Sequence, residues 1–262
     1  MRNSRVRAKL RNGEPVICTK MNTFDPVVMD MIGLFGFDCV WLCREHGGLD
    51  WDRLGHLIRT ASLNDMDTLV RVSKGSYSDF VRPLELGATG LMVPHCRDEI
   101  EARQIVRQTR FHPLGLRPID GGNSDGRYTL IPVKDYMQQA NENTFVIVQI
   151  EDVEALDKID QFAAVEGIDV LFIGPGDLSQ SLGAPGQSDH PRIAETIARV
   201  AEACRRRGKH WGLPMSLETA PKYVQMGARF LACGADVLGL KEYYGELRRR
   251  LEGQGVVFSP RI

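Results

Sequence analysis

Charged and polar side chains follow several short apolar runs of this sequence, at the point where each run ends. Glu151 comes directly after one run, and Asp177 follows the next run across a Gly-Pro-Gly segment. Arg71 lies at the end of an earlier run, and His46 follows another. Two carboxylates can hold a divalent cation together, an arginine can stabilise developing negative charge, and a histidine can transfer protons. These residue types predict a metal-assisted acid–base site.

The apolar runs recur eight times along the chain. Each run is short and nearly continuous in apolar character, which is typical of strands buried on both faces of a parallel sheet. The predicted strands comprise residues 15–19, 38–42, 68–72, 90–93, 144–150, 169–173, 210–213 and 230–233.

Amphipathic segments separate the predicted strands. Residues 98–109 and 191–207, for example, place apolar side chains on one helical face and charges on the other. Alternation of strands and helices implies right-handed parallel crossovers, and eight repeats favour closure into a barrel. No Gly-x-Gly-x-x-Gly follows the first strand, which disfavours a dinucleotide-binding sheet. The chain of 262 residues is close to the length of about 250 typical of one (β/α)8 barrel. We therefore expect one α/β domain over residues 1–262, a (β/α)8 TIM barrel.

In such barrels the carboxyl ends of all strands face one mouth, where the chemistry takes place. Glu151, Asp177, Arg71 and His46 would therefore meet there. Each has a structural alternative. Glu151 could be a first-turn acid of a helix over residues 152–162, and Asp177 could be the N-cap of a helix over residues 178–182. Arg71 could be a salt-bridging core residue, and His46 a hydrogen-bonded residue of the mouth.

The two acids would repel each other unless a cation lay between them. Mg²⁺ or Mn²⁺ suits one or two carboxylates completed by waters and substrate oxygens, and Co²⁺ or Zn²⁺ is also compatible with the pair. Glycines 174 and 176 let the backbone approach a ligand closely. The amides of Gly176 and Asp177, at a helix start, are placed to bind a carboxylate. The other histidines are not accompanied by polar residues at strand ends. His95, which follows the fourth strand, is the best candidate site residue among them.

The composition narrows the partners. The net charge is −1, so no global field attracts nucleic acid or anionic lipid. The six cysteines include no Cys-x-x-Cys pair, and several lie inside apolar runs, as expected of buried thiols in a reducing compartment. We see neither a secretory signal nor a run of about 18 apolar residues. We expect a cytoplasmic protein with small-molecule partners, without nucleic-acid or membrane partners.

Two further segments depart from the strand–helix alternation. Residues 112–127 are rich in Gly, Pro, Asn and Asp and predict a long loop, followed by a helix over residues 131–143. Residues 238–251 form an amphipathic pattern with Leu240, Tyr244, Leu247 and Leu251 on one stripe. This helix is predicted to close the barrel or to dock on a partner subunit.

The chain resembles the HpcH/HpaI aldolases from about Val6 to Leu251. The most specific marker is residues 167–183, GIDVLFIGPGDLSQSLG. The others are 36–38 (GFD), 45–47 (EHG), 86–90 (LGATG), 113–117 (PLGLR) and 149–151 (QIE). The resemblance implies a barrel of the phosphoenolpyruvate/pyruvate-binding type and a class II, metal-dependent aldehyde-lyase. Such an enzyme cleaves a 4-hydroxy-2-oxo acid to pyruvate and an aldehyde through a pyruvate enolate.

The resemblance also assigns roles by position. The metal ligands fall on Glu151 and Asp177, the oxo-acid-binding arginine on Arg71 and the base on His46, while Gln149 lines the same site. The metal would act as a Lewis acid on the oxo acid, without a Schiff-base lysine. The family forms oligomers, commonly hexamers built from dimers that exchange a C-terminal helix. The resemblance therefore implies a homo-oligomer in which residues 238–251 are exchanged.

The sequence departs from the family pattern at two places. The family usually has Asp three residues before the histidine, where this chain has Cys43, and a thiol cannot orient an imidazolium as an acid does. Glu45 is adjacent to His46 and is not expected to reach the same place. Arg117-Pro118 stands where Arg-Gly is common, which predicts a reshaped loop and aldehyde pocket. The alternatives are therefore an oxo-acid decarboxylase, other enolate chemistry on the same metal site, or a non-catalytic oxo-acid-binding barrel.

Overall fold

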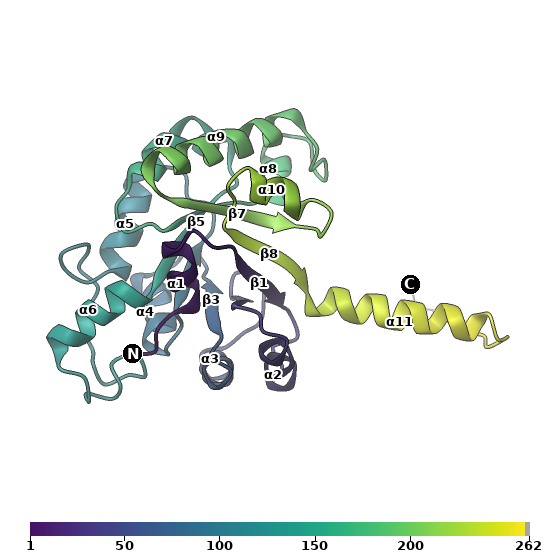
Figure 1. Ribbon diagram of the computed structural model, residues 1–262, viewed down its shortest axis with the longest axis horizontal. Helices are drawn as coiled ribbons and strands as arrows, with labels where there is room; N and C mark the ends of the chain where they lie inside the picture. Colours follow the sequence, from purple (N-terminus) through teal and green to yellow (C-terminus); the bar gives the residue numbers. More distant parts are fainter. Residues whose placement is uncertain (260–262) are drawn as a thin grey trace.

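The computed structural model describes residues 1–259, in which eight parallel strands close into a barrel in sequence order (Figure 1). The predicted domain extends to residue 262, and its last three residues lie outside the described part. The strands are β1 (Val16–Met21), β2 (Cys39–Cys43), β3 (Asp67–Arg71), β4 (Gly90–Val93), β5 (Phe145–Ile150), β6 (Val170–Ile173), β7 (His210–Met215) and β8 (Phe230–Ala235). The predicted fold class is confirmed, and every predicted strand bound lies within two residues of the observed one.

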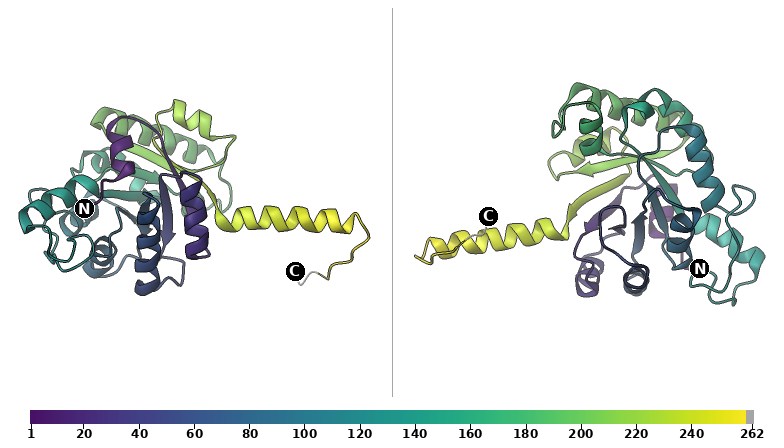
Figure 2. Two further views of the ribbon diagram at one scale, coloured as in Figure 1. Left: turned by 60° about the horizontal axis from the view of Figure 1, so that its bottom comes forward. Right: turned by 180° about the vertical axis from the view of Figure 1, so that it is seen from behind.

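The helices mostly surround the barrel on its outer face, although the last one projects away from it (Figures 1 and 2). They are α1 (Arg5–Arg11), α2 (Pro26–Leu34), α3 (Trp51–Leu63), α4 (Tyr77–Glu85), α5 (Glu99–Thr109), α6 (Val133–Asn143), the 3-10 helix η1 (Val153–Lys158), α7 (Ile159–Ala164), α8 (Pro175–Ser181), α9 (Pro191–Arg207), α10 (Ala220–Gln225) and α11 (Asp236–Glu252). None of the helices within residues 1–259 is long and apolar enough to cross a membrane.

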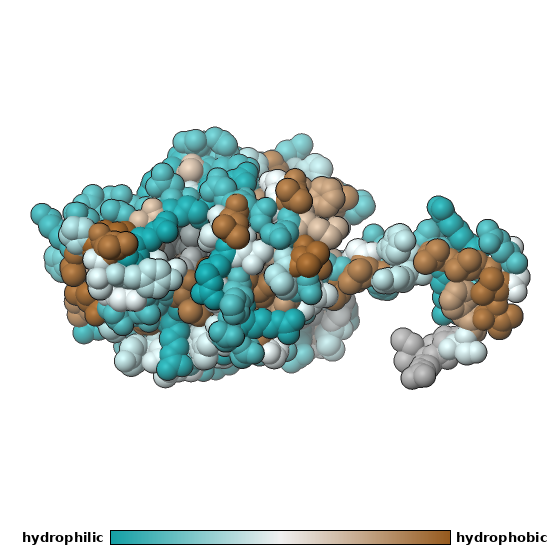
Figure 3. Space-filling view, turned by 90° about the horizontal axis from the view of Figure 1, so that it is seen from below, coloured by the Kyte–Doolittle hydropathy of each residue, from teal (hydrophilic) through white to brown (hydrophobic). Residues whose placement is uncertain are grey.

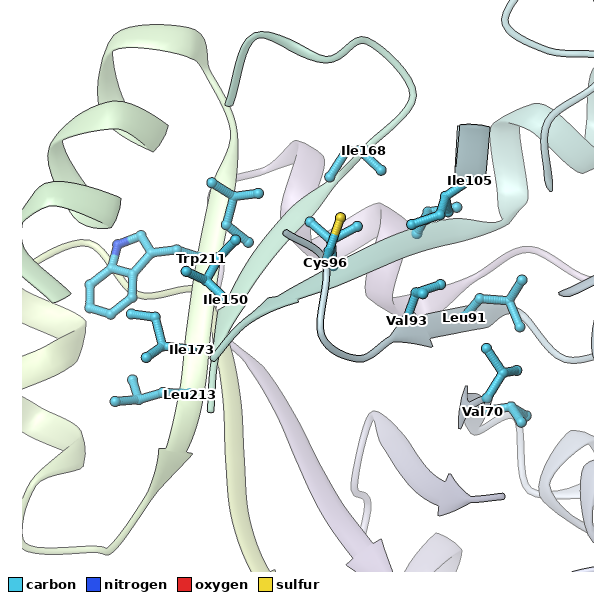
Figure 4. Packing of buried hydrophobic residues seen from close by; sticks show 14 of the residues in the cluster. Val70, Leu91, Val93, Cys96, Ile105, Ile150, Ile168, Ile173, Trp211 and Leu213 are labelled. Carbon is cyan, nitrogen blue, oxygen red and sulfur yellow. The ribbon is translucent and has the colours of Figure 1, made fainter. Parts of the chain in front are cut away.

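Two apolar layers result from the alternation of side chains along the strands. Side chains that point outward, such as Val70, Leu91, Ile150 and Leu213, pack against the helices (Figure 4). Side chains that point inward fill the barrel, where Phe172 makes edge-to-face contacts with Trp41 and Phe230. The strands are therefore apolar on both faces, which is why they appear in the sequence as continuous runs rather than as alternating patterns.

Helix α1 closes the amino end of the barrel. Val6 and Leu10 belong to the same buried cluster as the inward-facing strand residues. Ser4 Oγ and the Val6 amide both donate to Oδ2 of Asp67 at the start of β3, at 2.6 and 2.9 Å. Since this end is filled, a ligand can approach the barrel interior only from the carboxyl ends of the strands.

Two local expectations were wrong. The segment after Glu151 is not one helix over residues 152–162, because it starts as η1 and becomes helical only in α7. Asp177 is not an N-cap, because α8 begins at Pro175 and its N-cap is Gly174, which places Asp177 in the first turn. Both corrections follow from local backbone geometry that the apolar pattern does not encode.

The long loop after α5 lies near the amino end of its own barrel. The Asp125 amide donates to the carbonyl of Glu85, the last residue of α4, which precedes β4. Inside the loop Arg117 is buried and donates to Asp125 Oδ2 and the Tyr136 hydroxyl at 2.6 and 3.1 Å. The Arg117-Pro118 departure therefore lies in a region away from the carboxyl-end mouth of the same chain. That this departure reshapes the aldehyde pocket stays a prediction.

Candidate active site

Several predicted site residues lie at or just after the carboxyl ends of strands on one side of the barrel order, from β3 to β6. Arg71 is the last residue of β3, Glu151 directly follows β5, and Asp177 belongs to the first turn of α8 after β6. Cys43, the last residue of β2, is paired in register with Arg71 across the sheet. Barrel closure therefore brings residues separated by more than 100 positions in sequence to one mouth.

Glu151 is the most buried acid of this mouth, with only 1% of the residue exposed. Its Oε1 accepts from the His95 amide at 2.8 Å, and its Oε2 accepts from Nε2 of Gln149 at 2.9 Å. The pKa of Glu151 is raised to about 7, mainly because the carboxyl group is buried. The hydrogen bond from the His95 amide, the charge of His95 and the charge of Arg71 act in the opposite direction and lower this pKa, whereas the negative charge of Asp177 raises it further. The effect of Asp177 means that the two carboxylates interact electrostatically, as two acids at one cation site would.

The backbone after β6 passes directly against Glu151. A Cβ at Gly174 would overlap Oε2 of Glu151, so the absence of a side chain is what permits this approach. Gly176 and Asp177 follow in the first turn of α8 and are exposed to solvent. One buried and one exposed acid thus follow the carboxyl ends of β5 and β6, and the second lies in the first turn of a helix, whose amides are free of intrahelical acceptors.

Arg71 is held beside Glu151 on several sides. The residue is 5% exposed, and its Cζ lies 4.9 Å from the centroid of the Trp41 ring. Nη1 donates to Oε1 of Gln149 at 3.4 Å, so Gln149 bridges Arg71 and Glu151. Nε lies 3.0 Å from Oε2 of Glu45, an ion pair that lacks hydrogen-bond alignment. Arg71 thus does form an ion pair, as the structural alternative predicted, but its guanidinium lies at the mouth of the barrel and not in the core.

The thiol of Cys43 also faces this guanidinium. Nε and Nη2 of Arg71 lie 3.3 and 3.1 Å from its sulfur, and the His46 amide donates to the same sulfur at 3.5 Å. The His46 ring itself is 62% exposed, and Nε2 lies 3.7 Å from Oε2 of Glu45. Glu45 therefore comes closer to His46 than expected, although not within hydrogen-bond distance. The sulfur lies against Arg71 and does not orient the imidazole.

Two residues of the mouth were not selected from the sequence as site residues. His95 has its ring 33% exposed, with Nδ1 3.3 Å from both carboxylate oxygens of Asp152. Nδ1 also lies 3.7 Å from Oε1 of Glu151, and Nε2 lies 3.7 Å from Oε1 of Glu45. His95 follows a strand end, and Asp152 follows Glu151. Their places after strand ends were the only indications in the sequence that these two residues belong to the site. Their pairing could not be predicted, because it requires the loop after β4 to approach the loop after β5.

The donor set fits a hard divalent cation. Within residues 1–259 no three or more His, Cys, Asp or Glu side chains are grouped so that they could hold a metal ion by themselves. Mg²⁺ does not need such a group, since it is usually held by one or two carboxylates together with waters and substrate oxygens. Glu151 and Asp177 match that pattern, and the two hydrogen bonds to Glu151 fix the orientation of its oxygens.

The fold and the mouth together define a class of protein: a (β/α)8 barrel with paired acids, an arginine and imidazoles at its open end. Comparison with known proteins specifies it further. Residues 21–241 match the model of the HpcH/HpaI aldolase/citrate lyase family. The chain belongs to this family, and that membership supports an aldolase or lyase activity.

Individual relatives agree with this family assignment. A 5-keto-4-deoxy-D-glucarate aldolase of Salmonella paratyphi C is 32% identical over 213 residues, which is 81% of this chain and 82% of the relative. The structure of an HpcH/HpaI aldolase from Desulfitobacterium hafniense superposes with a TM-score of 0.89 at 28% identity, covering 94% of this chain and 96% of that one. The citrate synthase SbnG superposes with a TM-score of 0.87 at 31% identity, covering 95% and 98%.

Proposed function

We propose that the protein is a metal-dependent aldolase that cleaves a 4-hydroxy-2-oxo acid to pyruvate and an aldehyde. The observation that carries the proposal is that Arg71, Glu151 and Asp177 all lie at or just after the carboxyl ends of strands of one barrel, in a chain of this family. Glu151 and Asp177 would hold Mg²⁺ or Mn²⁺, with Co²⁺ or Zn²⁺ as compatible alternatives. When bound, the ion would supply a Lewis acid that draws electron density from the oxo acid.

The residues of the mouth supply the remaining functions. The amides of Gly176 and Asp177 lie in the first turn of α8, where helix geometry leaves them without intrahelical acceptors, so they can bind the pyruvate carboxylate. Gln149 lines the same place. Removal of the C4 hydroxyl proton lets the C3–C4 bond break, and its electron pair moves to the C2 oxygen as the enolate forms. Arg71 would stabilise that charge, and His46, the base expected from the sequence, or the neighbouring His95 would accept the proton.

A second candidate function uses the same enolate platform for another reaction. The Cys43 thiol provides no acid to orient His46, which favours chemistry such as oxo-acid decarboxylation that removes no hydroxyl proton. A carbon–carbon condensation is a further reaction that the same enolate site could catalyse, since one similar structure is that of a citrate synthase. The third candidate is a barrel that binds oxo acids without turnover.

An assay of product formation separates the candidates. The purified protein is mixed with a panel of 4-hydroxy-2-oxo acids, 5-keto-4-deoxy-D-glucarate among them, and pyruvate is followed with a coupled dehydrogenase. We expect pyruvate release that stops with chelator and returns with Mn²⁺. Oxaloacetate decarboxylation without any aldol cleavage would favour the second candidate. Tight pyruvate binding without turnover would favour the third, and turnover that resists chelator would contradict the metal.

The affinity for metal is expected to depend on pH through Glu151. A carboxylate must lose its proton to bind a cation, and burial raises the pKa of Glu151 to about 7. Below pH 7 protons therefore compete with metal. The apparent affinity for Mn²⁺, measured by titration calorimetry, should rise up to about tenfold per pH unit toward pH 7 and level off above it. An affinity that stays constant between pH 5.5 and 8 would contradict Glu151 as a ligand.

We also propose that the protein is a homo-oligomer, hexameric by family analogy, in which α11 packs on a neighbouring subunit. The helix projects from the barrel as an arm and contains no buried residue (Figures 1 and 2). Apolar side chains gather on the arm (Figure 3), and Leu240, Tyr244 and Leu247 are 43%, 61% and 41% exposed. An isolated helix of this length is marginal in water, so packing against a partner would stabilise it.

The oligomer prediction has a direct test. Replacing Leu240 and Leu247 together by Asp should convert the oligomer into monomers, because charges would replace the apolar stripe of α11. Light scattering coupled to size-exclusion chromatography measures the mass, and Lys241→Asp on the same helix is the control that should leave the mass unchanged. A wild-type protein that is already monomeric at micromolar concentration would contradict the proposal.

A cytoplasmic location stays a prediction.

A further inference from the structure

The mouth contains one imidazole that is oriented by an acid, and it belongs to His95. Its Nδ1 lies 3.3 Å from both oxygens of Asp152. Asp152 is in turn held by Nε of Arg97 at 3.1 Å and is 9% exposed. An acid on one ring nitrogen fixes the tautomer and the ring plane and leaves the other nitrogen for chemistry. Here that nitrogen is Nε2.

The backbone places this ring next to the candidate metal ligand. His95 has a φ of 51°, the left-handed region that few non-glycine residues adopt. Its amide donates to Oε1 of Glu151 at 2.8 Å, and its carbonyl accepts from Nζ of Lys74 at 2.7 Å. Both ends of the residue are therefore fixed, and the unusual backbone conformation is maintained by contacts within the site, as is common where geometry serves function.

His46 lacks these features. Its ring is 62% exposed, compared with 33% for His95, and its one acidic neighbour, Glu45, lies at 3.7 Å. The position from which an acid would orient it holds Cys43, whose sulfur contacts Arg71. Nε2 of His95 is also 3.7 Å from Glu45, beyond hydrogen-bond distance, so within residues 1–259 no carboxylate is hydrogen-bonded to that nitrogen.

We propose that His95, positioned by Asp152, is the acid–base residue of this site, in place of His46. The inference rests on the proposed aldol reaction. Nε2 accepts the proton of the C4 hydroxyl, the C3–C4 bond breaks, the aldehyde forms, and the electron pair of the broken bond moves to the C2 oxygen. The same proton, delivered to C3 of the enolate, yields pyruvate, so atoms and charge balance. Asp152 acts through the ring and is a positioning residue.

Two reactions of the same Mn²⁺-loaded protein test the inference. Aldol cleavage needs a base for the hydroxyl proton, whereas oxaloacetate decarboxylation needs the enolate site without that base. We expect His95→Asn to lower kcat for cleavage by about 100-fold or more. The same variant should retain decarboxylation and the Kd for pyruvate, measured by calorimetry, within about threefold of wild type. Asp152→Asn should lower kcat for cleavage at little changed KM, and Cys43→Asp should bring no gain.

The controls separate this inference from the proposed function. The kcat for cleavage that remains in His46→Asn should be at least about ten times the kcat that remains in His95→Asn. His56→Asn, which removes an exposed histidine 3.6 Å from Asp52 on α3, should change nothing. If the wild type shows no aldol cleavage, the proposed function fails, whether or not it decarboxylates oxaloacetate. If the wild type is active and His46→Asn, rather than His95→Asn, abolishes cleavage, the inference alone is overturned. An equal loss of both reactions in His95→Asn also overturns it, since the role would then be structural.

A spectroscopic measurement provides a readout independent of turnover. Long-range ¹H–¹⁵N correlation spectra of the Mg²⁺-loaded protein should show a proton on Nδ1 of His95, because that nitrogen faces Asp152. The Nδ1 resonance should shift in Asp152→Asn and stay in place in Asp52→Asn. An unprotonated Nδ1 in wild type, or a resonance indifferent to Asp152, would contradict the orientation on which the proposal depends.

Discussion

Glu151→Gln is expected to abolish pyruvate release, with a loss of kcat of about 10³-fold or more. The change keeps the size of the side chain and removes the charge that a divalent ion requires. Glu151 is buried against Gly174 with a hydrogen bond to each oxygen, so its carboxylate is held in one orientation. The loss should be accompanied by a loss of Mn²⁺ affinity, measured by calorimetry.

The matched control for this variant is Glu154→Gln, which changes an exposed glutamate in η1. It should leave both turnover and Mn²⁺ affinity unchanged. Asp177→Asn should behave as Glu151→Gln does in both measurements, because the two acids are proposed to share the ion. If Glu151→Gln retained wild-type metal affinity while losing turnover, Glu151 would be a proton-transfer residue rather than a metal ligand.

Arg71→Lys is expected to give the second large effect, a loss of about 10²–10³-fold in kcat. Lysine keeps the positive charge but has no planar fork, so it cannot contact Glu45, Cys43 and Gln149 at once as the guanidinium does. The developing enolate charge would then face a mobile ammonium instead of a fixed donor. Steady-state kinetics with a 4-hydroxy-2-oxo acid measures the effect.

Arg44→Lys is a demanding control for the Arg71 variant. Arg44 also stacks on a tryptophan, with its Cζ 3.4 Å from the centroid of the Trp51 ring, but its Nε donates to the carbonyl of Leu49 outside the set of site residues. Its replacement should change kcat by less than about threefold. Equal losses in the two variants would mean that the effect arises from the lost aromatic packing and not from the site.

The strands were predictable from the sequence because a parallel barrel buries both faces of each strand. Val70 packs outward and Leu69 packs inward, so both positions must be apolar and the run is continuous. Eight such runs then required an architecture that covers every strand. The closure of the amino end by α1 was not predicted. Val6 and Leu10 lie in a short segment, and their burial depends on contacts with inward-facing strand residues that are distant in the sequence.

The site was predictable as far as it depends on strand ends. Arg71, Gln149 and Glu151 lie at or next to the last residues of β3 and β5, so the fold alone brings them to one mouth. His95 and Asp152 could not be paired in this way. Their contact depends on the left-handed backbone at His95 and on the turn into η1, which are features of loops and have no periodic signature in the sequence.

The arm formed by α11 shows a further limit of reasoning from one chain. Its apolar stripe predicted a buried face, and the helix was located to within two residues of Asp236–Glu252. Within residues 1–259 no residue of this helix is buried, which is why we propose that the pattern describes a contact between chains. An amphipathic pattern indicates that a face is buried, but it does not say by which molecule.

A crystal structure with Mn²⁺ and pyruvate tests the central claim most directly. We expect one anomalous-scattering peak at the carboxyl-end mouth, with an oxygen of Glu151 and an oxygen of Asp177 each within about 2.0–2.4 Å of the ion and the Arg71 guanidinium beside the pyruvate. An ion bound by only one of these acids, or bound elsewhere on the chain, would contradict it.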